Sequence, residues 1–384
     1  MLVLVDKLNL EDYNYSLQKK NIALYPTRKR ENSNLLVYKS KIITNTLFKN
    51  IVNYIPNDST IFFNDTKVIK SRFLFNKSQN IIIEILVIDF IILSKNSVEI
   101  NGLVGNNKKW KKNEYLILEK NSLELKAIKK NNKIIFSWNK SKEWIEIINI
   151  FGTLPLPPYI KRKVEESDLK DYQTVYSKKE GSIASPTAGL HFTKKIIEKL
   201  KLKIKTDYLT LHVGIGTFKP INKKNIIDHK MHSEEIIISK KNISNLNKSK
   251  NIIAVGTTSL RTLESLYFLG IKLSNRNTDI NIEQYPYMKN HKKYNKNEIC
   301  NIILKYMNSN NLNFIKFRSS LFIIPGYNFK FCNQLITNFH YPKSTLILLI
   351  AAFVGEDWKK IYKFATKKNF RFLSYGDSSL LFKK

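Results

Sequence analysis

A turn between an apolar strand and a helix carries side chains suited to holding an anion. In IIAVGTTSLRTLES, a run typical of a buried strand is followed by Thr257 and Ser259, and a helix is expected to begin near Leu260. Free backbone N–H groups and the positive end of the helix dipole favour a carboxylate or phosphate there. Arg261 could add a bidentate contact to that anion. The alternative is that Thr258 or Ser259 simply caps the helix, which is the commoner role of such residues.

A second candidate is His212, which stands at a predicted strand end in LHVGIGTFKP, before Gly214 and Gly216. Glycine lets backbone approach a ligand closely. The GxG spacing lacks the third glycine and following helix of a dinucleotide-binding turn, and the sequence has no GxxxxGK[ST] motif. Both facts argue against nicotinamide and P-loop nucleotide sites. His212 is therefore a candidate general base, with a satisfied core imidazole as the alternative.

Two further segments place histidines beside turn residues. SPTAGLHFTKK joins small residues to a histidine before a helix that Thr193 is expected to cap, and NFHYPKST repeats this pattern with a Ser344 cap. The candidate ligand-contacting residues in them are Thr187, Gly189, His191, Asn338 and His340. Binding groups favour loops at strand ends, so this clustering of histidines at turns indicates a functional site.

The segment MHSEE adds an ionisable pair. His232 and Glu234 share one face if this segment is extended, a geometry open to acid-base chemistry and equally to a solvated strand. No HExxH motif or Cys/His-rich spacing appears, so a metal site is not expected. Cys300 and Cys332 lack the spacing of a zinc or redox motif and are expected to be reduced thiols.

The overall charge is strongly positive. The 384 residues include 65 Lys and Arg against 31 Asp and Glu, a formal charge of +34. This charge favours a nucleic-acid partner, although the Lys-, Asn- and Ile-rich linkers also suggest nucleotide bias acting on tolerant surfaces. The start of the chain resembles neither a signal nor a transit peptide, and the longest apolar stretches, 81–93 and 346–355, are too short to span a membrane. A cytoplasmic protein is expected.

The motifs must be positioned by two kinds of structure. Short β-rich runs from about 61 to 150 suit a small antiparallel barrel or sandwich. After 150, strand, polar turn and helix repeat, which predicts an α/β domain. We therefore predict a mixed-sheet α/β body, 1–66 and 151–384, with an inserted small antiparallel β-barrel at 67–150.

Taken together, the motifs resemble those of the S-adenosylmethionine:tRNA ribosyltransferase-isomerase family of queuosine biosynthesis. The resemblance extends over most of the chain. It rests on an ordered series of blocks: FNDTKVI (63–69), GTLPLPPYI (152–160), YQTVYS (172–177), SPTAGLHFT (185–193), LHVGIGTFKP (211–220), MHSEE (231–235), VGTTSLRTLES (255–265), FIIPGYNFK (322–330), LITNFHYPKSTL (335–346) and FRFLSYGDSSL (370–380). The chain departs from the family pattern at Gln18, Asn34, Lys70 and Asn333, where the family usually has proline, arginine, proline and aspartate.

The resemblance implies a metal-free reaction with no further cofactor. S-adenosylmethionine serves as the donor of a ribosyl group, not of a methyl group. That group is transferred and isomerised onto 7-aminomethyl-7-deazaguanine at the tRNA wobble position, which gives epoxyqueuosine-tRNA and releases adenine and methionine. The expected partners are thus tRNA and S-adenosylmethionine, and the protein is expected to be a monomer that does not bind membranes.

Such a transfer needs a base, an acid, an anion site and a pocket for a flipped-out base. The acid-base roles are assigned to His212 or His340, with Glu234 as an orienting or alternative base. The methionine carboxylate is assigned to Thr257, Ser259 and Arg261. The rest of the donor pocket is assigned to Thr187, Gly189, His191, Gly214, Gly216 and Asn338, closed by Tyr375 and Asp377.

Two other functions explain part of the sequence. An S-adenosylmethionine-dependent tRNA methyltransferase would share the donor and the partner, but its usual glycine-rich loop after the first strand is not visible. A non-catalytic basic RNA-binding protein would explain the charge and the β-rich insert, and it leaves the His- and Gly-bearing turns unexplained.

Overall fold

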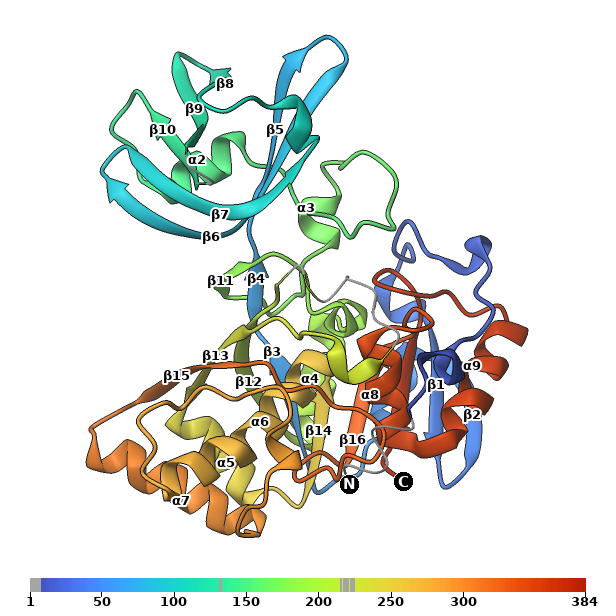
Figure 1. Ribbon diagram of the computed structural model, residues 1–384. Coiled ribbons are helices and arrows are strands. Elements are labelled where there is room, and N and C mark those ends of the chain that lie inside the picture. The colour runs from blue at the N-terminus through green and yellow to red at the C-terminus, as the bar shows by residue number, and fades with distance from the viewer. Residues whose placement is uncertain (1–7, 131–132, 215, 217–220, 222–224) are drawn as a thin grey trace. The chain divides into compact units, whose positions relative to one another are not determined.

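A computed structural model describes residues 8–130, 133–214, 216, 221 and 225–384. The chain divides into two compact units, one of residues 1–67, 171–179 and 185–384, the other of residues 68–170 and 180–184. The predicted return to the body was at 151, whereas residues 151–170 pack with the second unit. The predicted class, an α/β body with an inserted antiparallel barrel, is confirmed (Figure 1).

The body is built on one mixed sheet of nine strands. In spatial order these are β15 (Phe314–Ser319), β13 (Glu234–Ser239), β12 (Lys205–His212), β3 (Ser59–Asn64), β14 (Asn251–Val255), β16 (Gln334–Asn338), β17 (Ser378–Phe382), β1 (Asn34–Lys39) and β2 (Ile42–Leu47). The four central strands, β12, β3, β14 and β16, run parallel. The flanking pairs β12–β13 and β16–β17 are antiparallel.

Helices follow the strands as the repeated pattern predicts. They are α4 (Lys194–Lys203), α5 (Lys240–Lys248), α6 (Gly256–Ser274), α7 (Lys296–Ser309), α8 (Thr345–Val354) and α9 (Trp358–Lys367). The side chains of Thr193 and Ser344 accept bonds from the first turns of α4 and α8, so both predicted caps are confirmed.

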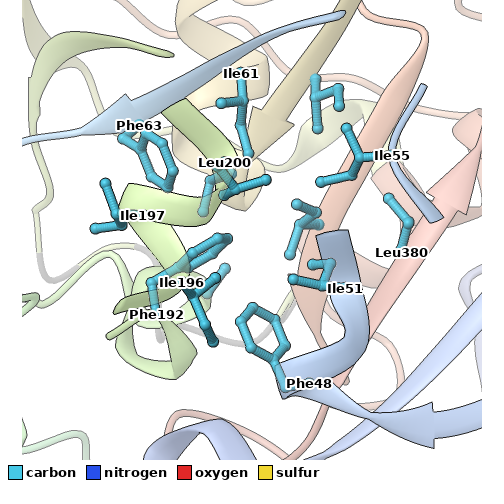
Figure 2. Packing of buried hydrophobic residues seen from close by; sticks show 14 of the residues in the cluster. Phe48, Ile51, Ile55, Ile61, Phe63, Phe192, Ile196, Ile197, Leu200 and Leu380 are labelled. Atoms are coloured by element: carbon cyan, nitrogen blue, oxygen red, sulfur yellow. The ribbon is translucent and has the colours of Figure 1, made fainter. Parts of the chain in front are cut away.

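One hydrophobic cluster of the body lies between strands of the sheet and two helical segments. Figure 2 shows side chains of α4 and of the 3₁₀ helix η4 (Phe48–Tyr54) meeting residues of β3 and β17. α6 packs against β3, β12, β14 and β16, and its residues from Gly256 to Ile271 are all buried. A helix buried on every side is held rigidly, and therefore its first turn is a fixed platform.

The second unit contains a six-stranded antiparallel sheet that nearly closes into a barrel. Its strands, in spatial order, are β5 (Arg72–Ser78), β6 (Ile81–Ser94), β7 (Ser97–Gly105), β10 (Lys133–Trp138), β9 (Leu123–Lys130) and β8 (Tyr115–Lys120). The end strands β5 and β8 contact each other, and α2 (Trp144–Phe151) packs into the same core. Two short strands, β4 (Thr66–Val68) and β11 (Lys179–Ser182), pair separately, and a short helix, α3, spans Asp168–Asp171.

Candidate functional site

The predicted motif segments follow the carboxyl ends of the four parallel strands, which lie side by side (Figure 1). Residues 65–66 follow β3, 213–214 follow β12, α6 begins directly after β14, and 339–345 follow β16. Because β17 runs antiparallel to β16 and β1 runs parallel to β17, the starts of β17 and β1 reach the same edge. Ligands of α/β proteins bind at this edge of the sheet.

Side-chain contacts tie these segments together. The Asn64 amide donates to Leu211 O at 3.0 Å and lies 3.5 Å from Thr258 Oγ1, so it joins β3 to β12 and α6. Thr187 Oγ1 donates to Asn338 Oδ1 at 3.1 Å, which joins the 3₁₀ turn η6 (Thr187–His191) to the end of β16. The segments are therefore neighbours in one region of the body.

The first turn of α6 is buried and has no side-chain cap. The helix begins at Gly256, four residues before the predicted start, and Val255 at its N-cap position supplies no side-chain bond. Thr258 and Ser259 thus lie inside the helix and do not cap it. Ser259 is fully buried, and its hydroxyl has no hydrogen-bond partner among the described residues.

Arg261 was predicted to bind the carboxylate of a ligand, but in the structure it pairs with a carboxylate of the protein. Its Nη1 lies 2.7 Å from Glu234 Oε2, and its Nε donates to Leu321 O at 3.1 Å. The other oxygen of Glu234 lies 3.0 Å from His232 Nε2 and accepts from Gly214 N at 3.3 Å. Glu234 and Arg261 are both buried, so this is an ion pair within the protein, extended to a histidine at its edge.

The environment keeps Glu234 ionised. Burial alone would raise the pKa of this carboxyl, but Arg261, His232 and the Gly214 N–H outweigh burial and lower the pKa to about 2. Glu234 is therefore a carboxylate at neutral pH and too weak a base to remove a proton by itself. Of its two predicted roles, the geometry favours the orienting one.

A small, partly open pocket with room for about one water molecule adjoins this cluster. Its polar lining residues are His232, Arg261 and Thr345, and its apolar lining residues are Met231, Leu321, Phe322, Ile323, Leu346 and Leu349.

His212 ends β12 and is partly exposed. Its Nδ1 lies 2.8 Å from Thr66 Oγ1, and Thr66 Oγ1 also donates to Lys179 O at 3.4 Å. Burial, then Lys316, lower the pKa of His212, although Glu235 and Asp65 oppose them, so the imidazole is neutral at pH 7. In register, His212 lies opposite Glu235 and therefore faces away from the Glu234 side of the sheet.

His191 is enclosed in a network of its own. The Asn338 amide donates to its Nε2 at 3.1 Å, so Nδ1 carries the proton and faces Ser33 Oγ at 2.8 Å. Burial, then Arg371 and Arg30, lower the pKa of His191 to about 3. Both ring nitrogens are occupied within the protein, which is the geometry of a structural histidine.

His340 is also buried. Its Nε2 lies 3.0 Å from Thr337 Oγ1, and its backbone N–H donates to the Tyr362 hydroxyl at 3.1 Å. Burial lowers the pKa of His340 to about 3. Of the two histidines predicted for acid-base work, the geometry favours His212, because His340 is buried and its Nε2 is already paired with Thr337.

The glycines of the predicted pocket make room for protein groups. A Cβ on Gly189 would lie 2.0 Å from the Tyr176 hydroxyl, so this glycine is needed for packing. A Cβ on Gly214 would lie 3.4 Å from the ring of His232, and a Cβ on Gly216 would lie 2.2 Å from its Nδ1. Residues 215 and 217–220 of this loop lie outside the described residues.

The two residues of SYGD are buried. Tyr375 packs edge-on against Tyr172 with ring centroids 6.0 Å apart. Asp377 accepts from Asn34 N at 2.9 Å, Asn34 Nδ2 at 3.0 Å and Arg371 N at 2.8 Å. This carboxylate therefore fixes the start of β1 at the edge of the sheet.

Comparisons with known proteins agree with the motif series. A family profile described as "Queuosine biosynthesis protein" matches residues 10–381. The chain is 37% identical over 383 residues to the S-adenosylmethionine:tRNA ribosyltransferase-isomerase of Sulfurihydrogenibium sp., covering 97% of this chain and all of the relative. The protein of the same name from Campylobacter jejuni is 37% identical over 381 residues, covering 97% and 98%.

The chain belongs to the queuosine biosynthesis protein family. A solved structure similar to this one, described as the S-adenosylmethionine tRNA ribosyltransferase from Thermotoga maritima, is 26% identical with a TM-score of 0.47, covering 96% of this chain and 99% of that one.

Two departures from the family pattern keep a local hydrogen bond. Asn34, at the position usually held by arginine, donates its side-chain amide to Asp377. Asn333, at the position usually held by aspartate, accepts from Ile252 N at 3.0 Å through Oδ1. The asparagine thus retains the acceptor oxygen that an aspartate would offer.

Two residues near the site have no assigned role in the sequence-based prediction. His232 is predicted there only as an ionisable pair with Glu234, and the structure places it in the lining of the pocket. Asp65, in the block FNDTKVI, is buried and accepts from Thr210 Oγ1 at 2.7 Å. Burial raises the pKa of Asp65, and Thr210 and two lysines oppose that rise. A lone carboxylate after a run of buried strand residues is the signal that could have identified it.

Proposed function

We propose that the chain is an S-adenosylmethionine:tRNA ribosyltransferase-isomerase. It transfers and isomerises the ribosyl moiety of S-adenosylmethionine onto 7-aminomethyl-7-deazaguanine at the tRNA wobble position. The products are epoxyqueuosine-tRNA, adenine and methionine. The single observation that carries the proposal is that the family's motif segments, distant in sequence, are neighbours at one edge of the body sheet.

The start of α6 is the proposed site for the methionine carboxylate. The N–H groups of its first turn have no side-chain cap, and the helix dipole favours an anion there. The hydroxyl of Ser259 is buried without a partner among the described residues, so it can donate to that anion, and Thr257 lies two residues before it. Arg261 neutralises Glu234 in this proposal and does not contact the ligand.

Three residues of the predicted pocket wall act mainly by holding it in place. Asn338 bridges Thr187 and His191, so the turn before α4 is fixed to the end of β16. Asp377 and Tyr375 support the neighbouring edge at β1 and β17. In this proposal, the donor lies against the glycine-bearing loop at Gly214 and Gly216.

His212 is the proposed acid for adenine departure. If Thr66 donates its proton to Lys179 O, then Nδ1 of His212 donates to Thr66 and Nε2 is left to exchange protons with a ligand. The neutral imidazole at pH 7 must first gain a proton to act as an acid, and exchange with solvent supplies it.

The tRNA partner agrees with the charge. A formal charge of +34 attracts phosphates and speeds encounter with tRNA at low salt. The reaction needs no metal or further cofactor, because the sulfonium of the donor itself stabilises charge at the neighbouring carbon. No helix in the described part of the chain has the length and apolar character that crossing a membrane requires. We propose that the protein is a cytoplasmic monomer. Light scattering would measure its mass in solution.

The test is incubation with S-adenosylmethionine and tRNA that carries the deazaguanine precursor, followed by nucleoside mass analysis. Epoxyqueuosine, free adenine and free methionine are expected. Formation of S-adenosylhomocysteine instead would mean methyl transfer, and binding of tRNA with no consumption of the donor would mean a non-catalytic RNA-binding protein. Either result overturns the proposal.

A further inference from the structure

His232 presents one ring nitrogen to a buried carboxylate, and its side chain is partly exposed. Its Nε2 is buried and lies 3.0 Å from Glu234 Oε1. The side chain as a whole is 24% exposed, and this exposure lies on atoms other than Nε2. Gly216 packs against the ring, because a Cβ at that position would lie 2.2 Å from Nδ1 and would displace the imidazole.

The carboxylate behind His232 is itself fixed. Glu234 contacts Arg261 Nη1 at 2.7 Å and accepts from Gly214 N at 3.3 Å. Arg261 in turn donates to Leu321 O at 3.1 Å from the buried helix α6. A carboxylate at this distance favours the tautomer with the proton on Nε2, which leaves the lone pair on Nδ1.

The segment that carries His232 is held on both sides. Met231 N donates to Gln284 Oε1 at 3.0 Å, and Arg318 Nη2 donates to Ser233 O at 2.9 Å. The histidine is therefore oriented before any ligand arrives, which proton transfer at a fixed atom requires. It also lines the pocket next to Arg261.

We propose that His232 is the proton-transfer residue of this reaction, with Glu234 and Arg261 as its positioning residues. The inference rests on the proposed function and names the group that performs one of its steps. In that step the C–H bond beside the sulfonium breaks and its electron pair stays on carbon, where the positive sulfur stabilises it. The proton binds Nδ1, and the imidazolium that forms is stabilised by the Glu234 carboxylate.

Other histidines of the body lack this arrangement. His191 has both ring nitrogens paired inside the protein, and His340 is buried with its Nε2 paired to Thr337. His212 lies 2.8 Å from a hydroxyl, and a hydroxyl stabilises an imidazolium less than a carboxylate does. Only His232 among these four combines a buried carboxylate with a position on the pocket.

His232→Gln is the decisive variant, compared with His291→Gln as the matched control. A glutamine amide can still donate to Glu234, but it cannot accept a proton at neutral pH. His291 lies in another loop, where its Nε2 is 2.7 Å from Pro286 O. Adenine release would be measured at saturating S-adenosylmethionine and precursor tRNA, together with KM for both substrates and the unfolding midpoint.

We expect His232→Gln to lower kcat by about 10²- to 10⁴-fold, the usual contribution of a general acid or base. KM for both substrates and the unfolding midpoint should stay close to those of the wild type, and His291→Gln should keep its activity. If His232 only supports the fold, glutamine will restore near-normal kcat while His232→Ala does not. That outcome overturns the inference.

The pH profile gives a second readout. The charged and titratable groups facing His232 are Glu234 from β13, Arg261 from α6 and His229 of its own segment. In the wild type kcat should fall on the acidic side as Nδ1 is protonated, and the residual rate of His232→Gln should lack this acidic limb. Retention of the same limb would place the base elsewhere.

The two proposals fail in different ways. If the wild type releases no adenine or methionine with precursor tRNA, the proposed function fails. If the wild type turns over and His232→Gln does so equally well, the function stands and only the role of His232 is lost.

Discussion

Two histidine-bearing regions at the same sheet edge differ in how their polar atoms are paired. Around His191 the protein supplies a partner to each ring nitrogen, and the side chain is buried. Around His232 it supplies a carboxylate to one nitrogen and leaves part of the ring exposed on a pocket. Both histidines stand in family motifs, and proton exchange with a ligand is proposed only for the second.

The difference teaches that burial and pairing decide what a motif histidine does. Burial holds His191 in its neutral form, since it lowers the pKa to about 3, and the network then serves to fix Asn338 and Ser33. The anionic carboxylate beside His232 favours the protonated ring once a proton arrives. The first region positions the edge of the sheet, whereas the second can perform chemistry on it.

Among the variants that test the contrast between the two histidine regions, Glu234→Gln should have the largest effect on stability. It leaves the Arg261 guanidinium buried without a counter-charge, so the free energy of unfolding should fall by about 3–5 kcal/mol. Urea unfolding followed by circular dichroism measures the loss. Glu235→Gln is the matched control, because its partner Lys316 is 65% exposed and such a pair contributes about 1 kcal/mol or less. Equal losses in both variants would contradict the buried pair.

Acid should destabilise the buried histidines before it affects Glu234. The pKa of His340 falls from 6.5 to about 3 on folding, so the unfolded chain binds a proton that the fold refuses between these values. Stability from this group is complete above about pH 6.5 and is lost as the pH falls towards 3. For Glu234, lowered from 4.5 to about 2, stability is complete above about pH 4.5 and is lost as the pH falls towards 2.

His340→Gln should therefore weaken the acid sensitivity. Between pH 7 and pH 5 the wild type should lose about 2 kcal/mol through His340, and the variant should not lose that part. His291→Gln, whose side chain contacts a backbone carbonyl in a loop, should keep the wild-type dependence. Unfolding free energies at three pH values measure both. Parallel curves for His340→Gln and the wild type would show that His340 is not buried as a neutral ring.

Much of the fold was predictable from local pattern. The alternation of β-rich runs and the strand-turn-helix repeats identify a barrel inserted into an α/β body, because the pattern reports which faces are buried. The gathering of the motif turns also follows, since parallel neighbours end at the same edge of a sheet. Capping by Thr193 and Ser344 was predictable because the chemistry is local.

The roles of individual site residues were not predictable in the same way. Arg261 looks free to hold an anion in the sequence, but its partner Glu234 comes from another strand and is found only in the folded chain. The start of α6 was placed four residues too late, because hydroxyl residues suggested a cap where the buried helix had already begun. The contacts of His232 with Gly216 and of Glu234 with Arg261 are found only in the folded chain.

Ser259→Ala tests the proposed carboxylate site at the uncapped start of α6. Because its hydroxyl has no partner among the described residues, its removal should leave the free energy of unfolding within about 0.5 kcal/mol of the wild type. KM for S-adenosylmethionine should rise about tenfold, as expected for loss of one hydrogen bond to a carboxylate. Thr262→Val is the matched control, since Thr262 is also buried and its hydroxyl has no partner in the part of the chain that the structure describes, one turn further along α6. An unchanged KM in Ser259→Ala would move the carboxylate away from this turn.

Asn34→Ala should have the smallest effect and tests the region that only supports the edge. Asp377 loses the bond from Asn34 Nδ2 at 3.0 Å, but it keeps the backbone N–H groups of Asn34 and Arg371. The free energy of unfolding should fall by about 1 kcal/mol, the net value of one such bond. kcat should stay within about twofold of the wild type, because the activation free energy should change by about 0.4 kcal/mol or less. A large loss of kcat with unchanged stability would mean that Asn34 contacts a substrate. The region around His191 and Asp377 would then take part in the reaction and would not only support the sheet edge.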